Sequence, residues 1–164
     1  MIVKVIGRCI SPVLYCLDLF QPIMILLARI WVAQVFFFSG LVKLQAFQAT
    51  ILMFATTYHV PFLSPSTAAF LATFAELALP VLLAVGFGGR ISILLFFIFN
   101  IYAAISYPFL WTSEGYMGLT QHIMWALTLG LLMCLGPGKI SVDYLLRKLH
   151  GHHLIWERHI HLTR

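Results

Sequence analysis

Residues 23–42 read IMILLARIWVAQVFFFSGLV, and a single charged side chain, Arg29, interrupts this apolar stretch. A helix needs roughly 20 apolar residues to cross a hydrocarbon core about 30 Å thick. Three more stretches of this kind follow, at residues 66–85, 91–110 and 117–135. This pattern predicts an all-α, polytopic membrane protein built as a bundle of four transmembrane helices.

The composition excludes a water-soluble domain. Of the 164 residues, 62% are hydrophobic and 9% are charged, whereas a soluble domain carries roughly a quarter charged residues. The mean hydropathy is +0.98. Four spans leave no room for a separate soluble unit, so we expect one membrane domain over residues 1–143 and a basic, His-rich tail over residues 144–164.

Basic residues predict the orientation of the bundle. Arg90 lies between the second and third stretches, and the other two connections carry little positive charge. Because cytoplasmic loops carry an excess of Lys and Arg, both termini and the turn at residues 86–90 are predicted to be cytoplasmic. The cations that flank the spans are Lys4, Arg8, Lys139, Arg147, Lys148, Arg158 and Arg164.

The stretch at residues 45–61, QAFQATILMFATTYHVP, allows a fifth span or an interfacial helix. It is short for a crossing, and Gln45, Gln48 and His59 would be costly in lipid. We therefore expect an interfacial helix with one buried face. That face is predicted to consist of Phe47, Ile51, Phe54 and Tyr58.

A second short helix is expected near the C-terminus. Gly136-Pro137-Gly138 should end the fourth span, because glycine can cap a helix and proline cannot continue it. Ser141 is a candidate N-cap and Asp143 falls in the first turn of an amphipathic helix.

Polar residues within the spans form the main candidate site. An ionisable side chain at the centre of a span costs roughly 2.5–3.5 kcal/mol, so it normally faces the bundle and has a partner. A rise of about 1.5 Å per residue places Gln34, Glu76 and Asn100 near the midplane, with Arg29 about one turn away. We expect Arg29 to pair with Glu76. Lys43 is a rival partner for Glu76, but we expect its side chain to extend to the outer interface.

Two functions are open for this polar layer. It could serve only to stabilise the bundle. Alternatively, it could form a pocket for the head of a quinone or another lipidic ligand, or relay a proton.

Other residues are candidates for metal binding. One set, predicted on the outer face, comprises His59, Glu114, Met117 and His122, although its spacing indicates no particular metal or haem. The tail could bind copper, zinc or nickel, or it could lie against anionic lipid. Its histidines are His150, His152, His153, His159 and His161.

The cysteines form no CxxC motif, which favours a role as small hydrophobic side chains. They are Cys9, Cys16 and Cys134.

Several short motifs resemble those of the DoxX family, in order and spacing, over residues 27–143. The first span carries Arg29, the run Phe36-Phe37-Phe38-Ser39-Gly40, and Lys43. The second carries Ala75-Glu76, followed by Gly86 and Arg90, and the closing motif is Gly136-Pro137-Gly138-Lys139 with Ser141 and Asp143.

This resemblance implies a four-helix bundle in the bacterial inner membrane with a connection to redox systems. The related DoxD proteins belong to thiosulfate:quinone oxidoreductases, and some DoxX members assemble with soluble redox enzymes. Others are encoded beside systems that handle modified copper-binding peptides. The group also includes thiol-oxidising relatives, whose paired cysteines are absent from this chain.

Two functional hypotheses follow. In the first, the protein is a non-catalytic membrane subunit or anchor of a redox or stress-response system and binds quinone in its polar pocket. In the second, it is a membrane adaptor in copper handling that uses the His-rich tail. Both hypotheses imply that the chain has a protein partner, and both are compatible with a homo-oligomer. The net charge of +5 comes from cations dispersed among apolar runs, which argues against nucleic acid as a partner.

Overall fold

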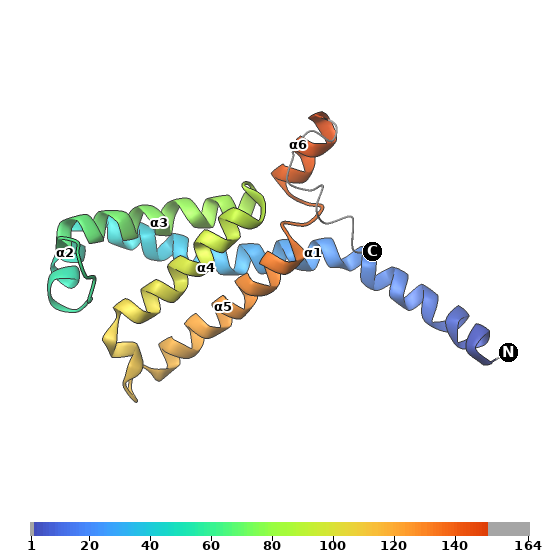
Figure 1. The fold of residues 1–164 in the computed structure, drawn as a ribbon, viewed down its shortest axis with the longest axis horizontal. Coiled ribbons are helices and arrows are strands. Elements are labelled where there is room, and N and C mark those ends of the chain that lie inside the picture. Colours follow the sequence, from blue (N-terminus) through green and yellow to red (C-terminus); the bar gives the residue numbers. More distant parts are fainter. Residues whose placement is uncertain (1, 151–164) are drawn as a thin grey trace.

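The structure is a computed structural model that describes residues 2–150, with side-chain environments from residue 11 to residue 149. The described residues contain helices and no strand (Figure 1). Their order is α1 (Ile2–Gln45), α2 (Phe47–Thr56), α3 (Pro65–Val85), α4 (Gly89–Ser106), the 3-10 helix η1 (Pro108–Trp111), α5 (Tyr116–Leu135) and α6 (Val142–His150). Within this described part, four helices are long and apolar enough to cross a membrane, namely α1, α3, α4 and α5. The predicted fold class is therefore confirmed.

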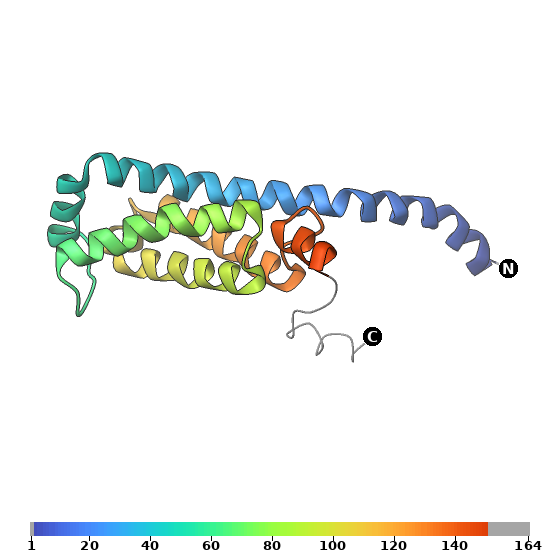
Figure 2. The same cartoon turned by 90° about the horizontal axis from the view of Figure 1, so that it is seen from above.

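The bundle has two distinct ends. At one end, here called the α2 end, lie α2, the loop from α2 to α3, and η1 (Figure 1). At the other, the α6 end, lie the turn from α3 to α4, the end of α5, and α6. Helix α1 packs most extensively on α3, and α4 on α5. The first part of α1 continues well past the bundle at the α6 end (Figure 2).

Two of the predicted spans have different limits in the structure. Helix α4 ends at Ser106, four residues before the predicted end at residue 110. The cause is Pro108, because proline disfavours a helical conformation in the residue before it, and Tyr107 is indeed extended. Helix α1 begins far ahead of residue 23 and passes through Pro12 and Pro22. Helices α3 and α5 agree with the prediction to within one residue.

The predicted interfacial helix is confirmed as α2. Its ten residues are too few to cross a bilayer, and Ala46 leaves the helical conformation and so separates it from α1. Its predicted face packs on the small residues Ala68 and Ala69 of α3, with Phe54 buried and the others partly buried. The partly buried members of that face are Phe47, Ile51 and Tyr58.

The α6 end is joined by main-chain and side-chain hydrogen bonds. Ser141 caps α6 as predicted, since its Oγ accepts from the Tyr144 amide at 3.2 Å. The Asp143 carboxylate accepts from the Gly88 amide at 3.2 Å. The Asp143 amide in turn donates to the Gly86 carbonyl at 3.2 Å. Helix α6 is therefore attached to the turn between α3 and α4.

Helices α1 and α3 approach each other closely at Gly40. A Cβ atom on Gly40 would lie 3.0 Å from Glu76 Cβ and 3.0 Å from Leu77 Cγ. Such a separation is shorter than ordinary van der Waals contact. Glycine at this position therefore lets the two helix backbones come together, as small residues commonly do between membrane helices.

We predict that Gly40→Ala destabilises the bundle by about 1 kcal/mol, because overpacking costs about 1–3 kcal/mol and outweighs the gain in helix propensity. Gly130→Ala is the matched control. Its Cβ would meet only Phe97, at 3.9 Å, so we expect it to be neutral or slightly stabilising. The measurement is the unfolding free energy in detergent, and equal effects of the two variants would contradict the close approach.

Candidate intramembrane binding site

Arg29 does not contact Glu76, contrary to the prediction. Only 1% of its surface is exposed, and its guanidinium lies at the α6 end. Its Nη1 donates to the Pro137 carbonyl at 2.6 Å. Its Nη2 donates to the carbonyls of Ile140, at 2.7 Å, and Ala84, at 3.2 Å. Arg29 therefore fastens the segment between α5 and α6 to the end of α3.

Glu76 pairs with Lys43 instead. The Lys43 ammonium lies 2.7 Å from Glu76 Oε2 and 2.9 Å from Oε1. It also lies 2.7 Å from Ser39 Oγ, one helical turn earlier on α1. These three acceptors match the three hydrogens of an ammonium group. Lys43 therefore turns into the bundle, and the expectation that it extends to the outer interface is wrong.

The direction of side chains along a helix explains both corrections. Each Cα–Cβ bond tilts toward the N-terminus of its own helix. On α1 this tilt points Arg29 toward the α6 end, away from the midplane. Helix α3 runs the opposite way, so Glu76 tilts toward the α2 end. Lys43 lies about one turn beyond Gly40, which faces Glu76, and tilts back toward that carboxylate.

Asn100 is buried, but its partner is His122 rather than another member of the predicted polar layer. Asn100 Nδ2 donates to the His122 carbonyl at 3.0 Å. Its Oδ1 lies 2.9 Å from His122 Nδ1. Because an amide oxygen can only accept, Nδ1 carries the proton and Nε2 is the ring nitrogen left for another partner. Gln34 is exposed on α1 and does not join the layer.

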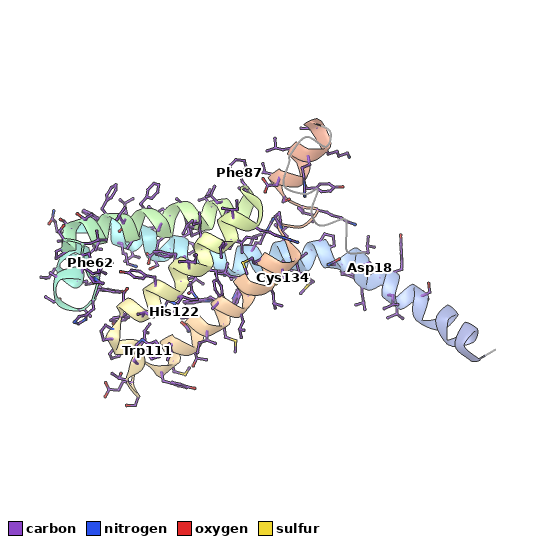
Figure 3. The ribbon with its side chains drawn as sticks, viewed as in Figure 1. Asp18, Phe62, Phe87, Trp111, His122 and Cys134 are labelled. Atoms are coloured by element: carbon purple, nitrogen blue, oxygen red, sulfur yellow. The ribbon has the colours of Figure 1, made fainter. Side chains whose placement is uncertain are left out.

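The predicted outer-face set is also dispersed. His122 faces α4 in the bundle (Figure 3), whereas His59, Glu114 and Met117 are exposed. The part of the chain described by the structure brings no three His, Cys, Asp or Glu side chains into a metal-binding group. The predicted metal site in the tail lies outside the described side chains, since residues 151–164 and the His150 side chain are not described. It stays a prediction.

The described cysteine side chains are free thiols. Cys16 lies on α1 and Cys134 near the end of α5, and both are exposed. The side chain of Cys9 is not described.

A cavity of about 630 Å³ occupies the α2 end of the bundle. Its polar groups include Lys43, Glu76 and His122, and aromatic rings and small or aliphatic side chains form most of its remaining wall. Arg29, Gln34 and Asn100 do not line it. The residues that line the cavity and matter most here are Phe36, Ser39, Lys43, Tyr58, Ala72, Glu76, Phe99, Ala103, Tyr107, His122 and Trp125.

The aromatic wall is itself tightly organised. Phe36 contacts Phe96 edge to face, with ring centroids 4.8 Å apart, and Trp125 in the same way at 5.0 Å. His122 meets Trp125 at 4.9 Å. Edge-to-face pairs of this kind contribute about 0.5–1.5 kcal/mol beyond the burial of their area. His122 is thus held by Asn100 on one side and by aromatic rings on the other.

The loop after α2 borders the cavity. Tyr58 is stacked between Phe54 and Tyr107, with ring centroids 4.6 and 4.9 Å apart. The amide of His59 donates to the Ser106 carbonyl at 2.8 Å. Burial, together with the nearby Glu76 carboxylate and Tyr107, raises the pKa of Tyr58 to about 12. Its phenol therefore stays protonated at neutral pH and can donate a hydrogen bond.

The contributions of Ser39, Tyr58 and Trp125 to this wall were not predicted from the sequence. Ser39 and Lys43 are four residues apart, a spacing that brings side chains together on a helix. The contact between these two side chains could therefore have been predicted from the sequence. Tyr58 was predicted only as part of a buried face. No pattern in the sequence distinguishes Trp125 from other aromatic residues that face lipid.

Comparison with known proteins identifies the family. The model of the DoxX family matches residues 24–109, which is more than half of the chain. This chain belongs to the DoxX family. It is also 27% identical to the inner membrane protein YphA of Escherichia coli (strain K12) over 129 residues, which cover 75% of this chain and 90% of that protein. No solved structure matches the chain.

Family membership and the four apolar helices make this a multi-pass protein of the bacterial inner membrane. The segment that matches the DoxX model contains both partners of the Lys43–Glu76 pair and Asn100. His122 lies beyond it, on α5. The polar wall of the cavity thus combines residues from inside the matched DoxX segment with one from outside it.

We predict strong energetic coupling between Lys43 and Glu76. Lys43→Met or Glu76→Leu alone leaves an uncompensated charge inside the membrane domain and should cost about 3 kcal/mol. The double variant should lose much less than the sum of the two single losses. The measurement is a double-mutant cycle of unfolding free energies in mixed micelles.

Lys139→Met is the control for this cycle, because Lys139 is exposed at the α6 end. It should change the unfolding free energy by no more than about 0.5 kcal/mol. Strictly additive losses in the double variant would show that the ion pair does not contribute as a unit.

Proposed function

We propose that this DoxX-family protein binds a lipid-soluble molecule with a polar ring head, of the quinone class, in the cavity at the α2 end. The observation that carries the proposal is an aromatic cavity of about 630 Å³, inside a membrane domain, with an ion pair and a histidine in its wall. We further propose that the protein acts as a non-catalytic membrane subunit or anchor of a redox or stress-response system.

The size and lining of the cavity suit such a ligand. Pockets for small molecules commonly measure about 300–1,000 Å³ and are mostly apolar, with a few polar groups that orient the ligand. Phe36, Phe99 and Trp125 offer ring surfaces against which a flat head can stack. An isoprenoid tail would meet the same apolar environment as lipid.

The polar groups favour the hydroxyl-bearing, reduced form of the head. All three hydrogens of the Lys43 ammonium already have acceptors in Ser39 and Glu76. The Glu76 carboxylate keeps lone pairs beyond the two that Lys43 uses. His122 Nε2 is an acceptor in the neutral ring, because Asn100 holds the proton on Nδ1. The Glu76 carboxylate and His122 Nε2 can therefore each accept a hydrogen bond from a hydroxyl group of the ligand.

The proposed role as a subunit draws on the redox connection that the DoxX resemblance implies. A protein that holds a quinol head near a soluble redox partner would give that partner access to the membrane pool. In this role the ligand is bound and oriented by the DoxX-family chain, and electron transfer belongs to the partner.

We predict that a short-chain ubiquinone, added to the purified protein in detergent, quenches the fluorescence of Trp125, which lines the cavity. Ala103→Phe should weaken the affinity at least about tenfold, equivalent to 1.4 kcal/mol, because the new ring occupies the cavity. Ala72→Leu fills the same space from α3 and should act in the same direction. His122→Phe keeps an aromatic ring but removes Nε2, so it should weaken competition by the reduced ubiquinol.

Ala55→Phe is the matched control, since Ala55 is exposed on α2 and does not line the cavity. It should leave the affinity unchanged. Each variant is compared with the unaltered protein in thermal stability, so that loss of binding is separated from loss of fold. Equal quenching in Ala103→Phe and Ala55→Phe would show that the quinone merely partitions into the micelle, and would overturn the proposal.

We also propose that the α6 end, with the N-terminus and the end of the chain, faces the cytoplasm. Arg90, Lys139 and Lys148 lie at this end. At the α2 end, by contrast, Lys43 is engaged by Glu76, and the exposed Glu114 carries negative charge. This distribution agrees with the excess of positive charge in cytoplasmic loops.

The orientation predicts opposite labelling at the two ends. With the native cysteines replaced by serine, a membrane-impermeant maleimide added to whole cells should label Ser113→Cys, at the α2 end, but not Lys139→Cys. Both positions are exposed, so both should react once the cells are lysed. Labelling of Lys139→Cys in intact cells would show that the topology is the reverse of the proposed one.

A further inference from the structure

The part of α1 from Ser11 to Gln21 is not buried against any other described element. Helix α1 contains 44 residues, or about 66 Å at 1.5 Å per residue, which is twice the thickness of a hydrocarbon core. Every side chain from Ser11 to Gln21 is exposed, and contacts with the bundle core begin near Ile25. Figure 3 shows Asp18 on the part of α1 that runs past the bundle.

This segment, residues 2–21, is an amphipathic helix with a narrow polar face and a wide apolar face. Five of its polar residues recur every three or four positions, so at about 100° per residue they fall within an arc of about 80° on the helix. They are Lys4, Arg8, Ser11, Tyr15 and Asp18, whereas Gln21 lies about 60° outside this arc. The rest of the circumference is largely apolar, and its large exposed side chains include Val13, Leu14, Leu17, Leu19 and Phe20.

Neither water nor the centre of the bilayer suits such a helix. In water, most of its circumference would be an exposed apolar surface, which proteins rarely leave uncovered. In the hydrocarbon core, Lys4, Arg8 and Asp18 would be costly. A helix that has a wide apolar face and a narrow polar stripe suits the boundary between the two, where each face meets its own solvent.

We propose that residues 2–21 lie along the membrane surface at the α6 end, with the apolar face in the acyl chains and the polar stripe toward water. The occupant of the apolar face is lipid. The lipid-facing surface of the transmembrane part of α1 continues directly into this face. Basic residues in this segment, Lys4 and Arg8, and at the same end of the bundle, Lys139 and Lys148, have the sign that anionic headgroups attract.

In the structure α1 is one continuous helix through Pro22, and Pro22 is the position at which it can bend as this arrangement requires. A proline inside a helix has no amide hydrogen to donate, and its ring clashes with the carbonyl four residues earlier, here that of Asp18. Sharp bends in helices are found mostly at such positions. Pro22 lies at the junction, between the fully exposed segment and the first buried residue of α1, Ile25.

The test uses the full-length protein with its native cysteines replaced by serine, in vesicles of phosphatidylethanolamine and phosphatidylglycerol. Spin labels are placed singly on the polar stripe, at Ser11 and Asp18, and on the apolar face, at Val13, Leu17 and Phe20. Collision rates with oxygen, which concentrates in lipid, and with a water-soluble nickel chelate are then measured. Labels at Leu131, a lipid-facing site on α5, and at Ser113 serve as references for lipid and water.

We expect nickel accessibility to be several-fold higher at Ser11 and Asp18 than at Val13, Leu17 and Phe20, with the reverse order for oxygen. Pro22→Ala should raise nickel accessibility at Leu17, because a straighter helix lifts this residue from the surface. Uniformly high nickel accessibility would mean that the helix extends into water. Spin–spin broadening at Leu17 would mean that a second copy covers the apolar face. Either result, or no effect of Pro22→Ala, would overturn the proposal.

Discussion

The structure depends on how three charged side chains are satisfied inside a membrane domain. An ionised group in lipid is costly without a partner, so Lys43 and Glu76 pair with each other and Arg29 turns to main-chain carbonyls. The Lys43–Glu76 pair and the close approach at Gly40 together set the position of α1 against α3. Arg29 sets the position of the segment between α5 and α6. Helices α4 and α5 pack on each other, and they also contact α3 and α1, respectively.

Different interactions hold the two ends of the bundle together. At the α6 end, Arg29, Asp143 and the glycine turns bring the loops together through many hydrogen bonds. At the α2 end, the helix pairs are joined by aromatic rings and by the loop that contains Tyr58. The polar groups of the cavity thus come from the ion pair and from His122, which Asn100 and Trp125 hold in a defined orientation.

Much of the fold could be predicted from the sequence because hydropathy and turn residues are local signals. The four spans, the interfacial α2, the glycine cap of α5 at Gly136 and the Ser141 cap were all evident in this way. The candidate site was predicted less well. Counting residues along a helix gives the depth of a Cα atom but not the position of the end of a long side chain. For this reason Arg29, rather than Lys43, was predicted to be the partner of Glu76. His122 was assigned to the outer face because its depth in α5 suggested an interface, whereas its rotation toward Asn100 is a property of helix packing.

Native mass spectrometry of the unaltered protein, extracted from its own membrane in mild detergent, shows whether the protein carries a bound quinone. We expect a fraction of the protein to carry one molecule of a quinone or quinol. We also expect this ligand to be enriched on the protein relative to its share of the extracted lipid. Protein that carries only phospholipid, in the proportions of the surrounding membrane, would contradict it.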